Sequence, residues 1–288
     1  MGCSDDDDPS GPDSELESVE IASSCPPLAA PSSTNVNVDL GVTYANQGGQ
    51  TQQLDIAWPK SGGPFPLIVL VHGGNWSGGS PSDLHNEMLV LANEGYAAAS
   101  LGYRLVNNGQ NIFPAAVEDV RCAVRWLRAH AADYDIDVSR VGAAGLSAGA
   151  HLASMLGTAS DVAGLDGACP ITDQPVDVQA VFAWAGPHDL RVDGPYTQEQ
   201  ADIVTEFLGA FPGDAPGTAA LASPEVHVTA DDPPYLLVHG TADALVPIAQ
   251  SREMRDALHA AGVRATIIEL PGVGHQFFPL DFAFAPQV

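Results

Sequence analysis

Short apolar runs and helical patterns alternate along most of this 288-residue chain. The first fully apolar run, Pro-Leu-Ile-Val-Leu-Val at 66–71, is typical of a strand that is buried on both faces. Further strands are predicted at 96–101, 139–145, 178–184, 235–238 and 265–270, and helices at 81–94, 113–132, 150–157, 198–208 and 248–261. Crossovers of this length force parallel strand pairing, so the pattern predicts an α/β fold with a mostly parallel sheet between helices.

The segments on either side of this alternation complete the predicted domain organisation. Residues 36–44 and 52–58 alternate apolar and polar side chains, which predicts two antiparallel strands joined by a turn at 46–49. Residues 1–33 are rich in Asp, Glu, Ser and Pro and predict a disordered acidic tether, because they cannot bury enough surface to offset chain entropy. We expect 34–288 to be one domain, with a short polar cap insertion at about 185–233 and an aromatic closing helix at 277–284.

The charge of the chain excludes one class of partner. The formal net charge is −26, and Lys60 is the only lysine. A surface this acidic repels phosphate backbones, so nucleic acid is not expected as a partner. No sequence feature predicts an oligomeric state.

The N-terminus and the cysteines bear on location. Cys3 in Met-Gly-Cys-Ser, followed by four aspartates, resembles the mature start of a bacterial lipoprotein, whose cysteine carries the lipid. The alternative is an acidic leader with an incidental cysteine; either way we expect an exported protein, at the cell surface or secreted. No Cys-x-x-Cys pair indicates a zinc or redox site. Export allows one disulfide, for which Cys122–Cys169 is favoured and Cys25 is the rival partner for either.

A serine between two glycines stands where the strand at 139–145 meets the next helix. The tight turn in Gly145-Leu-Ser147-Ala-Gly149 needs glycine on both sides, because a larger residue would collide with the neighbouring strand or helix. The turn places the Ser147 hydroxyl above the sheet at a helix N-terminus, where N–H groups favour developing negative charge. The pattern indicates a nucleophile.

Two residues elsewhere complete the set that a serine nucleophile needs. His275 lies in a glycine-containing loop after the last predicted strand, and Asp243 follows the strand at 235–238 in the same way. The order Ser147, Asp243, His275 is that of the α/β-hydrolases. We expect His275 to take the serine proton and Asp243 to orient the ring and stabilise the imidazolium. Asp189 is a rival acid, but it follows a strand too early in the chain.

The oxyanion formed by such a reaction needs fixed N–H donors. The N–H of Ala148, directly after the nucleophile, is one expected donor. The loop after the strand at 66–71 supplies Gly74 and Asn75 as the others. We expect the ring of His72 to tie this loop by hydrogen bonds rather than to take part in the chemistry.

Several motifs in combination carry a family resemblance. They are His72-Gly-Gly-Asn-Trp76, Tyr103-Arg104, Phe113-Pro-Ala-Ala-Val-Glu-Asp119, Arg125-Trp-Leu-Arg128 and Gly145-Leu-Ser-Ala-Gly-Ala-His151. Over about residues 50–280 the chain resembles the α/β-hydrolase esterases of the hormone-sensitive-lipase-like group, and within it the branch of acetyl and feruloyl esterases. It departs from that pattern at Asn75, where a third glycine is common, and at Gly102, where an aspartate often precedes Tyr-Arg.

These features predict a serine carboxylesterase that works through an acyl-enzyme and needs neither metal nor cofactor. Because no long apolar lid is evident, we expect short-chain or aromatic esters as substrates. We expect an aromatic pocket that includes Trp76, Tyr103, Trp184 and Phe277. The resemblance implies removal of acetyl or feruloyl groups from plant polysaccharide.

Other readings of the same residues stay open. The pocket fits aryl esters or polyester chains equally well. A serine peptidase of the prolyl-oligopeptidase type shares the Ser147 motif and the Asp-x-x-Val-Pro pattern, but we expect no propeller domain before this core. A catalytically silent hydrolase fold used for binding is disfavoured because all three triad residues are present.

Six residues near these motifs are expected to have structural roles. His151 should pack inside the fold, His188 and His239 should be turn residues, and Trp184 is as suited to the core as to the pocket. Glu118 and Asp119 should form salt bridges or hold a loop.

Overall fold

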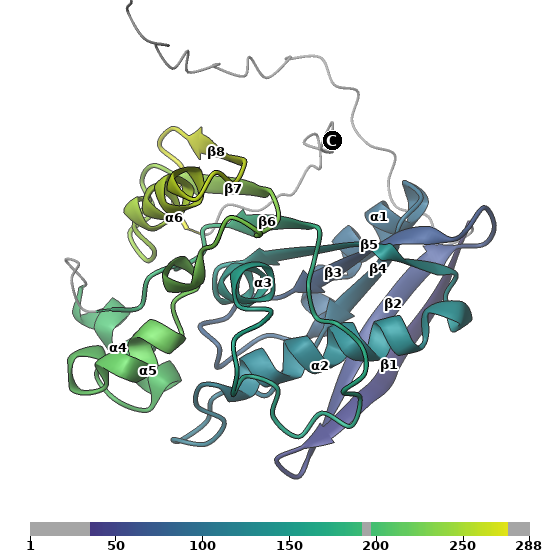
Figure 1. Cartoon of the computed structure of the whole chain (residues 1–288), viewed down its shortest axis with the longest axis horizontal. Helices are drawn as coiled ribbons and strands as arrows, with labels where there is room; N and C mark the ends of the chain where they lie inside the picture. Colours follow the sequence, from purple (N-terminus) through teal and green to yellow (C-terminus); the bar gives the residue numbers. More distant parts are fainter. Residues whose placement is uncertain (1–34, 192–196, 276–288) are drawn as a thin grey trace, which may run out of the picture. The chain divides into compact units, whose positions relative to one another are not determined.

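The computed structural model describes residues 35–191 and 197–275, and one sheet runs through them (Figure 1). Its eight strands lie in the order β1-β2-β4-β3-β5-β6-β7-β8. The β1–β2 and β2–β4 pairs are antiparallel, and the remaining neighbours are parallel. The bounds are β1 Val36–Gln47, β2 Gln50–Pro59, β3 Phe65–Val71, β4 Ala97–Leu101, β5 Ile136–Leu146, β6 Ala180–Trp184, β7 Tyr235–Gly240 and β8 Ala265–Leu270.

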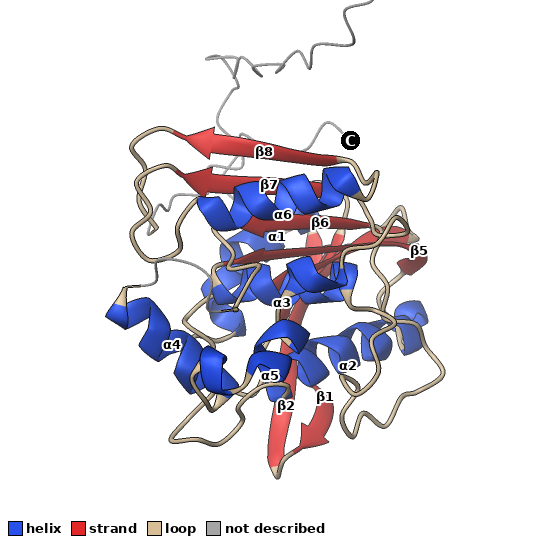
Figure 2. Cartoon of the chain, turned by 60° about the vertical axis from the view of Figure 1, so that its left-hand side comes forward, coloured by secondary structure: helices blue, strands red, loops and turns tan. Residues whose placement is uncertain are grey.

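Helices cover both faces of this sheet, which confirms the predicted α/β architecture. In Figure 2, α2, α3 and α6 lie in front of the strands and α1 lies behind them. The helices are α1 His85–Asn93, α2 Ala115–Ala129, α3 Ala148–Thr158, α4 Gln198–Leu208, α5 Pro216–Leu221 and α6 Ala249–Ala260; the short 3-10 helices are η1 Pro81–Leu84, η2 Ala131–Asp133, η3 Pro212–Asp214 and η4 Pro224–His227. None of the described helices is long and apolar enough to cross a membrane.

The predicted core lies between these layers. The apolar run at 66–71 is part of β3, whose residues Leu67, Val69 and Val71 are fully buried. The stripe on α2 formed by Val117, Val120, Val124 and Leu127 is buried as well, as its helical spacing predicts.

Two predicted helices differ from the observed ones at their ends. The helix predicted at 81–94 is divided into η1 and α1, with Leu84 at the junction. The helix predicted at 113–132 begins after Pro114, which takes the N-cap position of α2, and ends in the separate turn η2. Apolar spacing does not separate a 3-10 turn from the first or last turn of an α-helix, because both place side chains on one face.

The predicted cap segment at 185–233 is more helical than its sequence indicates. The helix predicted at 198–208 is present as α4, whose Thr197 and Gln200 form a capping box. The short helix α5 and the turns η3 and η4 were missed, because six residues or fewer are too short to show a period. The predicted tether at 1–33 and the predicted closing helix at 277–284 lie outside the described residues.

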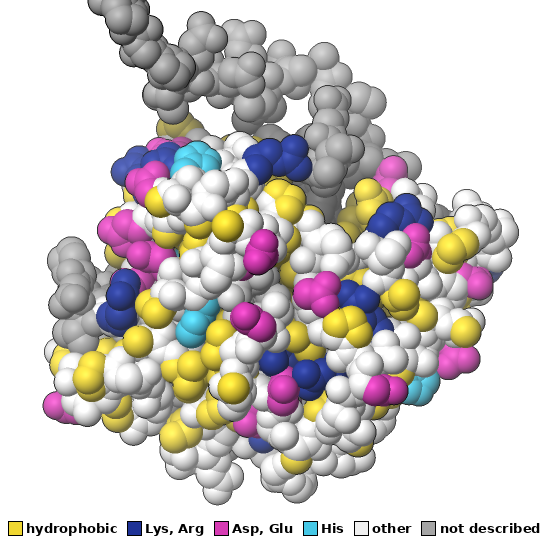
Figure 3. Space-filling view, viewed as in Figure 1, with side chains coloured by type: hydrophobic (Ala, Val, Ile, Leu, Met, Phe, Trp, Pro, Cys, Tyr) yellow, Lys and Arg dark blue, Asp and Glu magenta, His cyan; other side chains and the backbone are white. Residues whose placement is uncertain are grey.

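Charged side chains of the described residues form many ion pairs, several of them with buried arginines. On the face drawn in Figure 3, several Lys and Arg side chains lie beside Asp or Glu. Arg121 on α2 binds Asp166 at 2.6 Å, and Arg104 binds both Glu118 and Asp119, which confirms the salt bridges expected of that pair.

The segment at 159–179 is tied to α2 by covalent and polar contacts. Cys122 and Cys169 form a disulfide, the pairing favoured from the sequence. Arg121 donates to the carbonyl oxygens of Ala159 and Ser160, and Arg128 donates to that of Asp177. The disulfide therefore fastens a fully described segment that contains no helix or strand of its own.

We predict that this disulfide contributes strongly to stability. It closes a loop with a sequence separation of 47 residues, for which the chain-entropy model gives about 4 kcal/mol. The Cys122→Ser/Cys169→Ser protein should unfold at lower urea with a free energy of unfolding reduced by about 2–4 kcal/mol. A reductant should lower the stability of the parent protein and leave the double variant unchanged; equal sensitivity of the two proteins to reductant would contradict the assignment.

Candidate active site

The turn at residues 145–149, hereafter the elbow, carries Ser147 and is formed by close backbone contacts. Ser147 has φ 55° and ψ −121°, a conformation that residues other than glycine rarely adopt. A Cβ atom on Gly145 would lie 2.2 Å from the carbonyl oxygen of Gly149, and one on Gly149 would lie 2.0 Å from that of Val71. Both glycines are therefore required, as the sequence predicts.

The structure brings the three predicted catalytic side chains together. The Ser147 Oγ lies 2.9 Å from His275 Nε2, and His275 Nδ1 lies 2.7 Å from Asp243 Oδ2. An ionised carboxylate can only accept, so His275 carries its hydrogen on Nδ1 and Nε2 accepts from the serine hydroxyl. The Asp243 side chain is fully buried, while that of His275 is 13% exposed.

The carboxylate of Asp243 is held ionised by its hydrogen bonds. Burial raises the pKa of Asp243, but hydrogen bonds from His239, His275 and the Val246 N–H outweigh burial and hold this pKa well below its usual range. Oδ1 accepts from the N–H groups of Leu245 and Val246 at 2.9 and 2.8 Å. The rival acid Asp189 instead binds Arg191.

The loop that follows β3 lies against the Ser147 turn. A Cβ atom on Gly73 would lie 3.0 Å from the Leu146 carbonyl oxygen and 3.3 Å from Ser147 Cβ. Gly74, Asn75 and Trp76 all have positive φ, and the Gly74 carbonyl oxygen accepts from the Ser77 and Gly78 N–H groups. This backbone conformation is uncommon outside glycine, and strain of this kind concentrates at functional sites.

Two of the three predicted oxyanion donors lie at the cavity that holds the nucleophile. Asn75 and Ala148 line the same cavity as Ser147. Among the turn, loop and cap hydrogen bonds of residues 35–191 and 197–275, none uses the N–H of Gly74, Asn75 or Ala148. Their function as oxyanion donors stays a prediction.

His72 supports the loop as predicted. Its Nδ1 lies 2.8 Å from the Gly73 carbonyl oxygen, and its ring stacks on Tyr103 at a centroid distance of 4.4 Å. The Tyr103 hydroxyl donates to the His72 carbonyl oxygen at 3.0 Å. Burial lowers the pKa of His72, so its ring is a neutral structural group.

The cavity beside Ser147 is small and mainly apolar. It has a volume of about 40 Å³, and its walls include Trp76, Pro187, Leu245 and Val246. The cap helix α4 supplies Ile203 and Val204.

Of the described residues predicted for the pocket, one lines the cavity beside Ser147. Trp76 lines the cavity, but Tyr103 and Trp184 do not. Tyr103 stacks on His72, and Trp184 is a 6% exposed residue on β6. Trp184 thus takes the core alternative that the sequence left open, and Tyr103 lines a separate cavity beyond His72. Phe277 lies outside the described residues. Ile203 and Val204 were missed because an apolar helix face has the same sequence pattern whether it covers the core or lines a cavity.

Trp76 is oriented by two side chains from different parts of the chain. Its indole N–H donates to His151 Nδ1 at 3.2 Å, and its ring stacks on Phe207 of α4 at 4.1 Å. His151 Nε2 lies 2.7 Å from the Ala222 carbonyl oxygen. His151 is buried as predicted, and burial lowers its pKa to about 4, so the neutral ring connects the elbow helix α3 to the cap.

His239 is not a turn residue, and this prediction was wrong. It lies on β7, is fully buried, and contacts Ser251 Oγ at 2.7 Å through Nδ1. Its Nε2 lies 2.8 Å from the Val246 carbonyl oxygen and 3.3 Å from Asp243 Oδ2. Both of these oxygens can only accept, so Nε2 carries the hydrogen and donates mainly to Val246 and also toward Asp243, while Nδ1 accepts from the Ser251 hydroxyl. The sequence feature that could have indicated this contact is the spacing of four residues between His239 and Asp243.

His188 lies in the loop after β6 and is fully buried. Desolvation by burial, with further contributions from the neighbouring His151 and His239, lowers the pKa of His188 to about 3. The ring is therefore neutral in the native protein.

The comparison with family models decides the family. The BD-FAE model matches residues 54–258, which is most of the chain. The chain belongs to the BD-FAE family. The match includes the loop after β3, Ser147 and Asp243. It supports the resemblance to hormone-sensitive-lipase-like esterases seen in the sequence.

Relatives of this BD-FAE chain are named as esterases. It is 31% identical over 242 residues to the esterase LipQ of Mycobacterium tuberculosis, covering 80% of this chain and 55% of LipQ. The chain thus spans about half the length of the curated relatives that it matches.

Solved structures with the same fold cover more of their own length. A truncated carbohydrate esterase from gut microbiota is 29% identical, with a TM-score of 0.74 over 86% of this chain and 92% of that one. The propionate-bound esterase Est2 of Thermogutta terrifontis is 27% identical, with a TM-score of 0.71 over 88% and 91%. Within the described residues, no group of three or more His, Cys, Asp or Glu side chains is arranged to hold a metal ion.

We predict that His239 positions Asp243 for the reaction. In the His239→Gln variant, kcat for p-nitrophenyl acetate should fall about 10-fold with little change in KM, because a hydrogen bond to a charged group is worth roughly 1.5–3 kcal/mol. Ser251→Ala removes the donor to Nδ1 and should have a smaller effect in the same direction.

The matched control for this prediction is His259→Gln, on the exposed side of α6. It should retain the parent kcat. A fall in thermal stability of His239→Gln with unchanged kcat would show a purely structural role and contradict the prediction.

Proposed function

We propose that this protein is a serine carboxylesterase that hydrolyses short-chain or aromatic esters through an acyl-enzyme. The observation that carries the proposal is the continuous hydrogen-bonded line from Ser147 Oγ through His275 to the buried Asp243, with contacts of 2.9 and 2.7 Å. The names of the relatives agree with this reaction class.

The geometry supports a two-step reaction. The Ser147 Oγ attacks the ester carbonyl carbon while His275 Nε2 takes its proton, and the N–H groups of Ala148, Gly74 and Asn75 stabilise the oxyanion. The intermediate collapses as His275 protonates the leaving alcohol oxygen, which leaves an acyl-Ser147 ester. Water then attacks that ester with His275 as the base, which releases the acid and restores the serine.

The first test is loss of the nucleophile. The parent protein should cleave p-nitrophenyl acetate, and Ser147→Ala should lower kcat by at least about 10⁴-fold, because the covalent step is lost. Ser139→Ala, at an exposed residue of β5, is the matched control. Undiminished turnover by Ser147→Ala would refute the mechanism.

A pair of acid variants separates the two candidate carboxylates. Asp243→Asn should reduce kcat by about 10⁴-fold, as expected when the imidazole loses its orienting charge. Asp189→Asn should retain kcat, since Asp189 binds Arg191. The opposite ranking in a kcat measurement would transfer the role to Asp189.

The small cavity beside Ser147 favours short acyl groups. Its volume of about 40 Å³ leaves little room beyond an acetyl or propionyl chain. Est2 of Thermogutta terrifontis has structures with propionate and with butyrate bound. Removal of acetyl groups from plant polysaccharide is the finer proposal, supported by the size of this cavity and by the description of the gut microbiota relative as a carbohydrate esterase; the feruloyl alternative would need its aromatic ring to lie outside this cavity.

We predict that α4 limits acyl length at this cavity. Val204→Ala should raise kcat/KM for p-nitrophenyl octanoate relative to acetate by about 10-fold, because removal of two methyl groups from a wall is worth roughly 1–3 kcal/mol of discrimination. Val204→Trp should reduce butyrate hydrolysis more than acetate hydrolysis. The control is Glu206→Ala, at an exposed residue of the same helix, which should leave the ratio unchanged. An unchanged acyl profile in both Val204 variants would place the acyl group elsewhere.

Export of the protein, with a lipid on Cys3 or in secreted form, is also a proposal. The Cys122–Cys169 disulfide supports it, because disulfides persist in oxidising compartments.

A further inference from the structure

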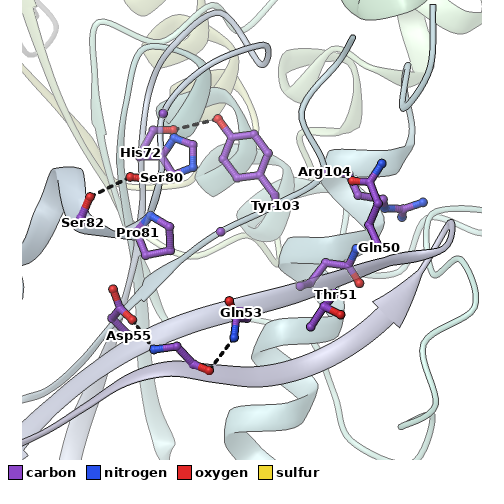
Figure 4. Close-up of a pocket in the computed structure, with 14 residues that line it drawn as sticks. Gln50, Thr51, Gln53, Asp55, His72, Ser80, Pro81, Ser82, Tyr103 and Arg104 are labelled. Carbon is purple, nitrogen blue, oxygen red and sulfur yellow. Dashed lines mark hydrogen bonds between the residues drawn. The ribbon is translucent and has the colours of Figure 1, made fainter.

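A second cavity lies on the other side of the loop that follows β3 (Figure 4). It has a volume of about 330 Å³, within the range of small-molecule sites, and it shares no lining residue with the cavity beside Ser147. Its walls are β2, the first turn of η1 and the start of the segment after β4. His72 and Gly79 belong to this cavity, whereas Asn75 and Trp76 belong to the other, so one loop separates the two.

Charged groups in the walls are already compensated by the protein. Asp55 accepts from the Gly41 N–H at 2.6 Å and contacts His85 Nε2 at 2.6 Å. Arg104 binds Asp119 and Glu118 on α2. A cationic ligand would compete with His85 for Asp55, and an anionic ligand would compete with two carboxylates for Arg104. The cavity therefore favours a neutral ligand.

The groups left to meet a ligand are neutral hydrogen-bonding side chains. Gln53 donates through Nε2 to the Gly41 carbonyl oxygen, which leaves its amide oxygen as an acceptor. The Ser80 hydroxyl donates to Asp83 Oδ1 at 3.2 Å and accepts from Ser82 Oγ at 2.8 Å, so both serine oxygens keep acceptor capacity. The ring of Pro81 stands between these groups and adds an apolar surface (Figure 4). Several side chains that can hydrogen-bond to hydroxyl groups surround a small apolar surface. This combination suits a sugar ring, which carries hydroxyls at its edge and C–H groups on its faces.

The wall that faces the ester site is rigid. A Cβ atom on Gly79 would lie 2.3 Å from His72 Nδ1 and 2.7 Å from the Gly73 carbonyl oxygen. The Tyr103 ring stacks on His72 and its hydroxyl binds the His72 carbonyl oxygen. This wall of the cavity is thus preformed by close backbone contacts, which lowers the ordering cost of binding there.

We propose that this cavity binds a neutral sugar residue at a site separate from the ester site. The inference deepens the proposed function. A role of this sugar site in holding an esterified polysaccharide rests on that proposed function. Binding itself needs no ester and no active serine, so it can be measured independently.

The test measures binding of xylotetraose and cellotetraose, two neutral oligosaccharides without ester groups, to the full chain carrying Ser147→Ala. Isothermal titration should show saturable binding of at least one, with a Kd of about 1 mM or tighter. In the same background, Ser82→Trp fills the cavity and should weaken binding at least about 10-fold, and Gln53→Ala should weaken it roughly 3- to 10-fold. Thermal unfolding checks that each variant is folded.

Val204→Trp is the matched control, because it fills the cavity beside Ser147 instead. It should leave oligosaccharide binding unchanged. Loss of binding in Val204→Trp but not in Ser82→Trp would move the sugar to the ester site and overturn the proposal. Absence of saturable binding by either oligosaccharide, or tighter binding of trigalacturonate, would overturn it as well. Hydrolysis of p-nitrophenyl acetate by the parent protein tests the esterase proposal separately, so the two can fail independently.

Discussion

The close approach of three backbone segments at the end of β3 is the constraint on which the site depends. Gly149 packs against the carbonyl oxygen of Val71, and Gly73 packs against that of Leu146, with no side chain between them. This contact presses the elbow and the loop after β3 together. It brings Ser147 to the same cavity as Asn75, one of the predicted oxyanion donors.

A second constraint is the buried carboxylate of Asp243. A charge in this position is stable only because two backbone N–H groups and two histidines surround it. One of those histidines, His275, faces the serine, and the other, His239, faces the interior and Ser251. The carboxylate is therefore held from both sides, and its orientation toward His275 follows from the packing of β7 and α6.

The predicted cap segment at 185–233 contacts the loop after β3 through stacked aromatic side chains that are distant in sequence. Phe207 of α4 stacks on Trp76, and His151 of α3 binds both Trp76 and the Ala222 carbonyl oxygen. These contacts bring Val204 and Ile203 to the cavity wall. The loop after β3 thus faces an apolar cavity on one side and a polar cavity on the other, and its rigidity is shared by both.

The sequence by itself determined the sheet, the elbow and the order of the three catalytic candidates. Those features rest on local rules: buried strands are continuous apolar runs, tight turns need Gly145 and Gly149, and parallel strand ends meet at one edge. Only the tertiary structure decided which aromatic residues reach the cavity and which histidine supports the acid. The sequence left Trp184 open between core and pocket, did not say which cavity Tyr103 lines, and misassigned His239, because the direction of a side chain at a strand end depends on neighbours that are distant in sequence. Long-range packing sets these side-chain directions, and the periodic pattern of the sequence does not predict them.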